Sequence, residues 1–281
     1  MSQSRHLVAC FVLAYSFYAE ASPSSCPQHF AYGTAPDLIN PKLGRASRPI
    51  CYQAYAMLHS GITLSALWSA EHLTRQSVQS AETLERPKGN AFHPDNALPI
   101  GERAELVDYA KSGFDRGHLV PSGDEPTADA QLETFSLANM IPQNSRLNRG
   151  AWERVESAVR HYALSAGELY VVTGPAYLGD RIDTLKGRVY VPTHVCKAVY
   201  NPINKKSGVY WFANADVEDY EVITVNELAK RIGVDVLPAV PAQSKSIAMA
   251  LPQPLAKRYG SRSTEDGGVV HLAEFFKRWG R

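Results

Sequence analysis

The sequence has no surplus of charge of either sign. Its 29 basic residues almost balance its 28 acidic ones, so the formal net charge at pH 7 is +1. It also lacks internal repeats, low-complexity tracts and blocks of like charge, and nothing in it indicates a disordered arm. A protein that holds a polyanion by overall charge alone is usually far more basic. Any contact with a polyanion therefore has to come from a local cluster of basic side chains.

An apolar run long enough to span a bilayer, which takes about 20 residues, is also missing. The N-terminal run Leu7–Tyr18 has only twelve residues. Arg5 precedes it, and Ala19-Glu20-Ala21 follows it with small residues at the two positions that a signal peptidase reads. This pattern predicts a cleavable secretory signal over residues 1–21, export to the periplasm or the medium, and no attachment to a membrane.

Neither a CxxC pair nor an HExxH motif occurs, so a zinc site is not expected. Cys26, Cys51 and Cys196 remain after removal of the signal, and export implies an oxidising compartment. Cys26 and Cys51 bracket a stretch rich in Pro and Asn, and a disulfide between them would tie this N-terminal segment to the body of the protein. Cys196 lies in an apolar run typical of a strand, which favours a buried and inert thiol.

The order of the predicted elements indicates the fold class. Two β-prone runs, Tyr52–His59 and Thr63–His72, predict a hairpin that turns at Ser60-Gly61, whereas Thr74–Ala110 is polar and broken by prolines, which predicts a long irregular segment. Further elements are a short strand or turn at Phe114–Val120, strands at Leu169–Thr173, Arg188–Pro192, Val195–Tyr200 and Val209–Ala213, and helices at Asp129–Phe135, from about Asn148 to Ala166, at Thr224–Ile232 and at His271–Trp279. Because strands and helices mix without regular βαβ alternation, we predict one α+β domain over residues 22–281, with a mixed or antiparallel sheet and flanking helices.

The most informative motif is Asp115-Arg116-Gly117-His118. A neutral imidazole can take a proton from water near neutral pH, which makes His118 a candidate general base. The planar guanidinium of Arg116 matches two phosphate oxygens at once, although Arg116 could instead be a structural partner of Asp115. Gly117 leaves the backbone free to present His118 closely.

Three further polar residues follow this motif: Asn139, Asn148 and Glu156. Mg²⁺ keeps most of its waters and tolerates sparse protein ligation, so one Asn carbonyl oxygen is enough to anchor it. Asn148 is the candidate ligand, with a plain helix N-cap as the alternative. Glu156 lies eight residues later, about 80° past two full helical turns, and could hold metal-bound waters together with Asp115. The alternatives are a turn residue for Asn139 and a solvated carboxylate for Glu156.

The segment from Phe114 to Glu156 resembles the core motif of the DNA/RNA non-specific endonucleases, a family built on a ββα-metal (His-Me finger) site. The resemblance implies that His118 is the general base and that Asn148 is the one direct protein ligand of Mg²⁺. It also implies that Asn139 and Glu156 support the substrate and the metal-bound waters. Mn²⁺ could replace Mg²⁺ in such a site.

The resemblance further implies a secreted endonuclease that cuts DNA and RNA with little sequence preference and leaves 5′-phosphate ends. Arg86 falls where family members carry a phosphate-contacting arginine, and Arg149 is a second candidate for the phosphate groove. Arg146, Arg154 and Arg160 either line this groove or form a solvated face. Two other functions stay open, a catalytically silent nucleic-acid-binding protein and a phosphodiesterase restricted to small nucleotides, and the sequence also leaves a homodimer open.

Overall fold

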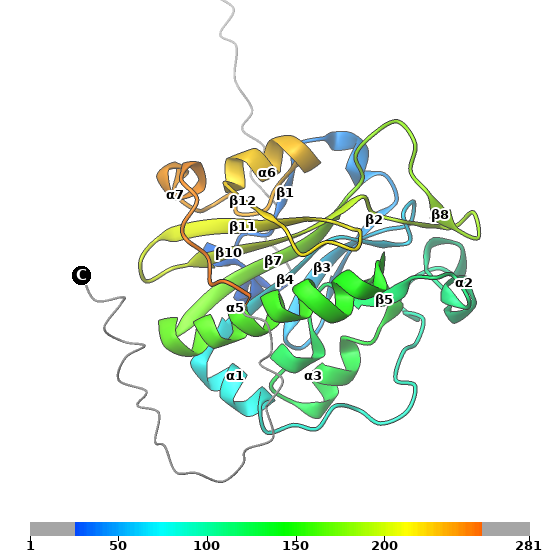
Figure 1. Ribbon diagram of the computed structural model, residues 1–281, viewed down its shortest axis with the longest axis horizontal. Helices are drawn as coiled ribbons and strands as arrows, with labels where there is room; N and C mark the ends of the chain where they lie inside the picture. The colour runs from blue at the N-terminus through cyan, green and yellow to red at the C-terminus, as the bar shows by residue number, and fades with distance from the viewer. Residues whose placement is uncertain (1–25, 255–281) are drawn as a thin grey trace, which may run out of the picture.

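A seven-stranded antiparallel sheet forms the centre of the computed structural model, which describes residues 26–254 (Figure 1). The predicted signal peptide and the predicted helix His271–Trp279 lie outside these residues. The strand order is β12-β11-β10-β7-β4-β3-β2. The strands are β2 (Ser47–Cys51), β3 (Tyr55–Ser60), β4 (Ser65–Thr74), β7 (Glu168–Ala176), β10 (His194–Asn201), β11 (Lys206–Ala213) and β12 (Glu221–Ile223).

Short elements surround this sheet. Three two-stranded sheets lie within residues 26–254: β1 (Asp37–Leu38) with β13 (Val234–Asp235), β5 (Asp115–His118) with β6 (Met140–Gln143), and β8 (Thr184–Leu185) with β9 (Val189–Tyr190). The α-helices are α1 (Arg75–Ala81), α2 (Leu106–Tyr109), α3 (Ala128–Glu133), α4 (Ser145–Leu147), α5 (Glu153–Ala166), α6 (Val225–Ile232) and α7 (Ala242–Ser246).

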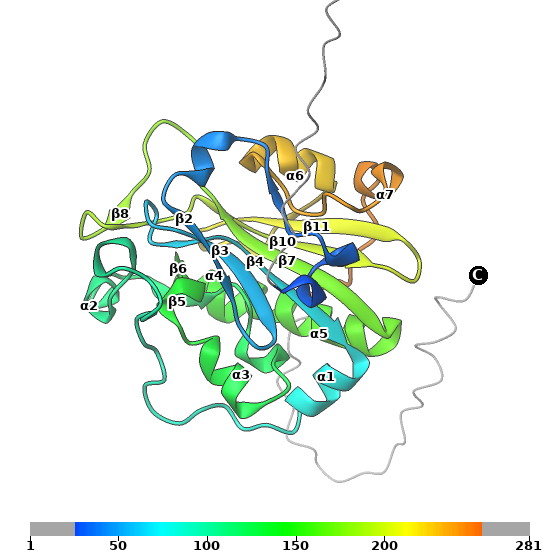
Figure 2. The same cartoon turned by 180° about the vertical axis from the view of Figure 1, so that it is seen from behind.

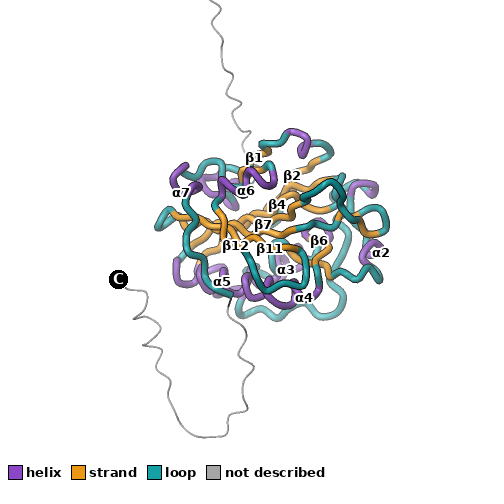
Figure 3. The backbone as a smooth tube through the Cα atoms, turned by 45° about the horizontal axis from the view of Figure 1, so that its top comes forward, coloured by secondary structure: helices purple, strands orange, loops and turns teal. Residues whose placement is uncertain are grey.

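Helices cover both faces of the sheet. Figures 2 and 3 show α6 and α7 on one side and α3 and α5 on the other, and Figure 2 shows α1 next to α5. Strand β10 shows the consequence, because successive side chains of a strand point to opposite faces. Val195 and Val199 pack in the core on the α5 side, whereas Cys196 and Ala198 pack in the core on the α6 side. Within residues 26–254, no helix combines the length and the apolar character that a membrane crossing requires.

The helical segment that follows β6 is not uniform. Its N-cap is Asn144, whose side chain accepts hydrogen bonds from the backbone N–H groups of Arg146 and Leu147. A π-helical turn, Asn148–Trp152, separates α4 from α5, and Gly150 has non-helical dihedrals there (φ −115°, ψ −109°). Asn148 itself has helical dihedrals and lies one turn inside the segment, so the N-cap alternative for Asn148 is wrong. Such π-turns inside helices are frequent at functional sites.

The α+β class and most predicted elements are confirmed. The hairpin of β3 and β4 is present, and α6 ends at Gly233, which adopts the left-handed conformation that favours glycine. The prediction of an irregular chain throughout Thr74–Ala110 was wrong at both ends, because α1 begins at Arg75 and α2 lies at Leu106–Tyr109. Thr74 and Ser77 form a reciprocal capping box, which satisfies backbone donors at the helix start.

The predicted cysteine chemistry is also confirmed. Cys26 and Cys51 form a disulfide that closes a loop with a sequence separation of 25. Cys196 is a buried free thiol that donates to the carbonyl oxygen of Gly174 at 3.3 Å. Burial raises the pKa of Cys196 to about 12, so the reactive thiolate is scarce at neutral pH.

Replacing both bridged cysteines (Cys26→Ser with Cys51→Ser) should destabilise the protein by about 3–4 kcal/mol, since the open loop regains conformational freedom in the unfolded chain. We expect the Tm to fall by roughly 10 °C in a calorimetric scan. Reductant serves as the control: it should lower the Tm of the wild type and leave that of the double variant unchanged. Equal sensitivity of the two proteins to reductant would contradict this assignment.

Candidate active site

His118 lies at the end of β5, which pairs with β6 so that His118 is opposite Met140 and Gly117 is opposite Ile141. A Cβ atom on Gly117 would lie only 2.0 Å from Oε1 of Gln143. The Gln143 side chain is completely buried and occupies the space beside the Gly117 backbone. Glycine is therefore required here by this close approach rather than by an unusual φ angle.

Two aromatic rings enclose His118. Its ring meets Phe135 edge to face at a centroid distance of 5.0 Å and lies 5.9 Å from Phe92. His118 is half-buried, and its Nε2 atom is buried without a hydrogen-bond partner among the described residues. Burial, followed by the nearby charge of Arg86, lowers the pKa of His118 to about 3. The imidazole is therefore neutral at neutral pH, the form that can accept a proton.

Two arginines pack on these same rings. The guanidinium carbon of Arg116 lies 3.9 Å from the centroid of Phe92, and that of Arg86 lies 5.4 Å from the centroid of Phe135. The structure thus brings Arg86, from the irregular segment after α1, together with the DRGH motif. The alternative in which Arg116 pairs with Asp115 is not observed, because the cation that pairs with Asp115 is Arg149.

Asp115 connects β5 to the helical segment. Its carboxylate accepts hydrogen bonds from Asn148 Nδ2 (2.9 Å), Ser145 Oγ (3.1 Å) and two nitrogens of Arg149 (2.8 and 2.7 Å). Burial alone would raise the pKa of Asp115, but the bonds from Arg149, Asn148 and Ser145 outweigh it and lower the pKa. Because an ionised carboxylate only accepts, the Asn148 amide must turn its NH₂ group to Asp115. The Oδ1 atom of Asn148 forms no hydrogen bond within residues 26–254, so this neutral oxygen is free to coordinate a metal ion.

Asn139 has a different environment from Asn148. It is completely buried, and its Nδ2 donates to the carbonyl oxygens of Val120 (2.9 Å) and Thr134 (3.0 Å). Its Oδ1 accepts from the N–H of Val120 (3.1 Å) and from Ser69 Oγ (3.4 Å). The whole amide is therefore used inside the protein, where it holds the segment that directly follows His118.

Glu156, a residue of α5, lies near three other charged side chains, Lys197, Asp124 and Arg160. Burial raises the pKa of Glu156 to about 7, while Lys197 opposes this rise and Asp124 adds to it. Arg160 donates to Asp124 at 2.6 Å, and Lys197 donates to Thr173 at 2.7 Å. Glu156 is half-buried with a strongly shifted pKa, so the alternative of a freely solvated carboxylate is wrong.

Lys197, which was not among the residues predicted from the sequence, is only 1% exposed. It donates at 3.5 Å to the carbonyl oxygen of Leu119, the residue after His118, and lies 3.9 Å from Glu71 Oε1. The available signal was a charged residue in the middle of the apolar run Val195–Tyr200. An isolated lysine at such a place is rarely buried without a partner.

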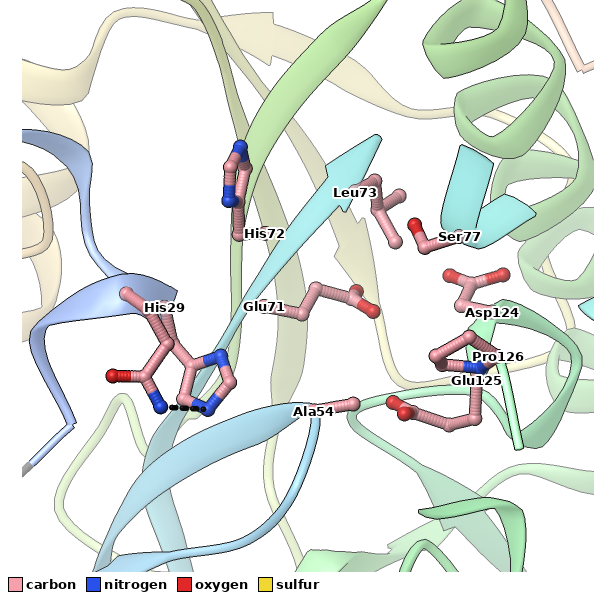
Figure 4. Close-up of a pocket in the computed structure, with 10 residues that line it drawn as sticks. His29, Ala54, Glu71, His72, Leu73, Ser77, Asp124, Glu125 and Pro126 are labelled. Carbon is pink, nitrogen blue, oxygen red and sulfur yellow. Dashed lines mark hydrogen bonds between the residues drawn. The ribbon is translucent and has the colours of Figure 1, made fainter. Parts of the chain in front are cut away.

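A pocket of about 180 Å³ borders this charge cluster. Figure 4 shows the carboxyl groups of Glu71, Asp124 and Glu125 facing the same space. Glu71 and Glu125 are each 1% exposed. Burial, followed by the charge of Glu71, raises the pKa of Glu125 to about 10, and burial also raises the pKa of Glu71 well above its usual range. Glu125 is therefore protonated at neutral pH, and the raised pKa of Glu71 favours its neutral form, which limits the negative charge of the cluster.

The remaining predicted arginines are paired with acidic side chains. Arg149 is 74% exposed although it binds Asp115. Arg146 pairs with Asp216 at 2.7 Å, and Arg154 pairs with Glu218.

Two comparisons with known proteins bear on this geometry. The family model of the DNA/RNA non-specific endonucleases matches residues 35–243. A chain in the crystal structure of the EndoG/EndoGI complex matches with a TM-score of 0.68 and 26% identity, covering 80% of this chain and 96% of that chain. The chain therefore belongs to the DNA/RNA non-specific endonuclease family, whose members hydrolyse phosphodiester bonds, and the resemblance seen in the sequence is confirmed.

Curated relatives have names of the same kind. Nuclease C1 of Cunninghamella echinulata var. echinulata is 34% identical over 169 residues, which is 56% of this chain and 67% of the relative. The mitochondrial endonuclease G of Caenorhabditis elegans is 34% identical over 183 residues, 60% of this chain and 59% of the relative. The nuclease of Syncephalastrum racemosum is 40% identical over 121 residues. The matched parts span 38% to 67% of the lengths of these relatives.

The raised pKa of Glu125 predicts a specific dependence of stability on pH. The pKa is about 10 in the folded protein and has its ordinary value of 4.5 in the unfolded chain, so the native state binds more protons. The resulting stability is complete below pH 4.5 and is lost as the pH rises towards 10. The Gln side chain of Glu125→Gln does not titrate, so this variant does not lose stability in this way. The difference in Tm between the variant and the wild type should therefore rise from pH 6 to pH 9, by roughly 2–4 °C for each 1 kcal/mol of unfolding free energy that the wild type loses.

Calorimetric scans at pH 6, 7.5 and 9 measure this difference. Glu82→Gln, which removes an exposed carboxylate at the end of α1, is the matched control and should differ from the wild type by a constant amount. A Tm difference for Glu125→Gln that does not change with pH would rule out a buried, protonated Glu125.

Proposed function

We propose that this protein is a secreted, Mg²⁺-dependent endonuclease that cuts DNA and RNA with little base preference and leaves 5′-phosphate ends. The observation that carries the proposal is the hydrogen bond between Asn148 and Asp115. This bond uses the Nδ2 atom of Asn148 and leaves its Oδ1 atom free to coordinate a metal ion. We assign the general base to His118, the metal ligand to Asn148 and the binding of phosphate to Arg86 and Arg116.

The residues present fit a hard divalent cation. Mg²⁺ prefers oxygen ligands and keeps several waters, and Asn148 Oδ1 is an oxygen donor whose orientation Asp115 fixes. Glu156, with a pKa of about 7, ionises readily when positive charge is nearby, and we assign it to the metal-bound waters. Mn²⁺ accepts the same donors. When bound, the cation would polarise the phosphate and stabilise the departing oxygen.

The protein groups supply the rest of the reaction. His118 takes a proton from the attacking water, whose oxygen bonds to phosphorus while the bond from phosphorus to the 3′ oxygen breaks. The 3′ oxygen then takes a proton from solvent, and the phosphate stays on the 5′ end. The negative phosphate next to His118 favours the imidazolium that forms. Arg86 and Arg116, each held on an aromatic ring, bind the phosphate oxygens.

Two other predicted residues act less directly. We assign Asn139 a positioning role, in place of the contact with substrate and metal waters that the resemblance implies, because its amide already binds Val120 and Thr134. Arg149 binds phosphate through the part of its guanidinium that does not face Asp115. Contacts to phosphate carry no sequence information, which accounts for the low base preference that we propose.

His118→Ala should lower the rate of plasmid and RNA cleavage on the order of 10²- to 10⁴-fold, the usual contribution of a general base. Asn148→Ala should raise the Mg²⁺ concentration needed for half-maximal rate, and chelator should stop the wild type. Gel assays over a series of Mg²⁺ concentrations measure both effects. His161→Ala, an exposed histidine on α5, is the matched control and should keep wild-type activity.

The same assay separates the other two functions. Binding of plasmid and RNA without cleavage by the wild type would indicate the silent binding protein. Cleavage of dinucleotides without cleavage of plasmid would indicate the small-nucleotide phosphodiesterase. Full activity of His118→Ala, or of the wild type in chelator, would refute the mechanism.

Export of the protein is supported by the disulfide between Cys26 and Cys51, because such bonds persist in oxidising compartments. Some relatives are named as mitochondrial nucleases, so the destination has to be measured. N-terminal sequencing of the protein from the periplasm or the medium should begin at Ser22. Full-length protein retained in the cytoplasm would contradict export.

A further inference from the structure

An open groove of about 540 Å³ lies outside the site described so far. Basic side chains from two segments line it: Lys111 from the turn after α2, and Arg181 and Lys186 from the region of the β8–β9 hairpin. Phe114, the residue before the DRGH motif, also lines the groove. Figures 1 and 2 both show β8 and α2 at the same end of the molecule, next to β5.

The cations of this groove are not neutralised. In the part of the chain that the structure describes, Lys111, Arg181 and Lys186 form no ion pair, and Asp183 is the acidic residue among the groove's lining residues. All three cations are exposed. The ammonium group of Lys186 donates to the carbonyl oxygen of Val107 in α2. This hydrogen bond holds the ammonium group at the groove. The groove is thus locally basic in a protein with almost no net charge.

The backbone at both lysines is unusual. Lys111 has a φ of 57° and Lys186 a φ of 50°, in the left-handed region. Asn and Gly adopt this conformation most easily, and Asn-Gly is the preferred pair for a tight hairpin turn with two left-handed residues. In the β8–β9 hairpin, Lys186 stands at the position where Asn would be favoured, directly before Gly187, whose φ is 71°. Strained backbone of this kind is often kept at functional positions, and here it presents a cation.

The groove is aligned with the candidate active site. Alternate residues of a strand share a face and lie about 6.4–6.8 Å apart, so Arg116 and His118 point to one side of β5, and Phe114, directly before the strand, lies about 13 Å from His118. Phe114 and Phe92 pack on the same hydrophobic cluster, and Phe92 contacts both Arg116 and His118. This cluster therefore connects Phe114 at the groove to the residues around His118.

We propose that this groove binds the sugar-phosphate backbone of the substrate strand about two nucleotides from the scissile phosphate. This inference rests on the proposed function and adds a length requirement to it. A strand that reaches the groove gains contacts with Lys111, Lys186 and Arg181, whereas a tetranucleotide cut at its central phosphate does not reach it.

The double variant Lys111→Asn with Lys186→Asn tests the proposal. Asn fits the left-handed turns better than Lys, so the variant removes two charges without disturbing the fold, and its Tm should not fall. KM for a 24-nucleotide single strand should rise on the order of tenfold at 0.1 M salt, and the salt slope of binding should decrease by about 0.7 for each cation removed. The loss should shrink to less than twofold on the tetranucleotide.

The matched control is Lys205→Asn. Lys205 is also exposed and also has a left-handed φ, of 56°, but it lies in the β10–β11 hairpin and contacts α7 through its carbonyl oxygen. It should change neither KM nor the salt slope. An equal loss in this control would show that overall charge, not the groove, holds the strand.

Fluorescence anisotropy with the labelled 24-nucleotide strand in chelator gives a readout that does not depend on cleavage. Weaker binding by the double variant, with a smaller salt slope, supports the groove. Unchanged binding of the long strand, or an equal loss on the long and short strands, overturns it. If the wild type cuts neither strand in Mg²⁺, the proposed function fails, and the anisotropy experiment still decides whether the groove binds a polynucleotide.

Discussion

The bond between the Asp115 carboxylate and the Asn148 amide is the contact on which the candidate site depends. It connects a two-stranded sheet to the helical segment that follows it, and it fixes which atom of the amide stays free. The same carboxylate also accepts two hydrogen bonds from Arg149. Asp115 of β5 therefore fixes the positions of two side chains of the π-helical turn, Asn148 and Arg149. The π-helical turn that begins at Asn148 departs from a regular α-helix at Gly150, whose φ and ψ are not helical.

The protein also accommodates a group of buried carboxyl side chains, Glu71, Asp124 and Glu125. Removing ions from water is costly unless they are paired or neutralised. The structure uses both solutions: Arg160 pairs with Asp124, whereas Glu125, with its raised pKa, is protonated. Lys197 lies between this group and the backbone that follows His118. Lys197 thus links these buried charges to the end of β5, where His118 lies.

Positive charge is used locally in this nearly neutral chain. Several arginines of the helical segment are paired, as Arg146 is with Asp216. Within residues 26–254, the cations of the groove beside β8 and the two arginines on Phe92 and Phe135 form no such ion pair. This distribution agrees with the low net charge of the sequence, since a polyanion that is cut must also be released, and binding by a few phosphate contacts depends strongly on salt.

Local patterns in the sequence determined the α+β class, the hairpin of β3 and β4, helix α6 with its glycine cap, and the pairing of Cys26 with Cys51. They did so because periodicity, capping and residue chemistry act over short distances. Only the tertiary structure decided that Asn144 rather than Asn148 caps the helical segment, and that Asp115 pairs with Arg149 rather than with Arg116. It also decided the burial of Lys197 and Glu125. These features depend on which strands and helices face one another, and that arrangement comes from packing between residues far apart in the chain.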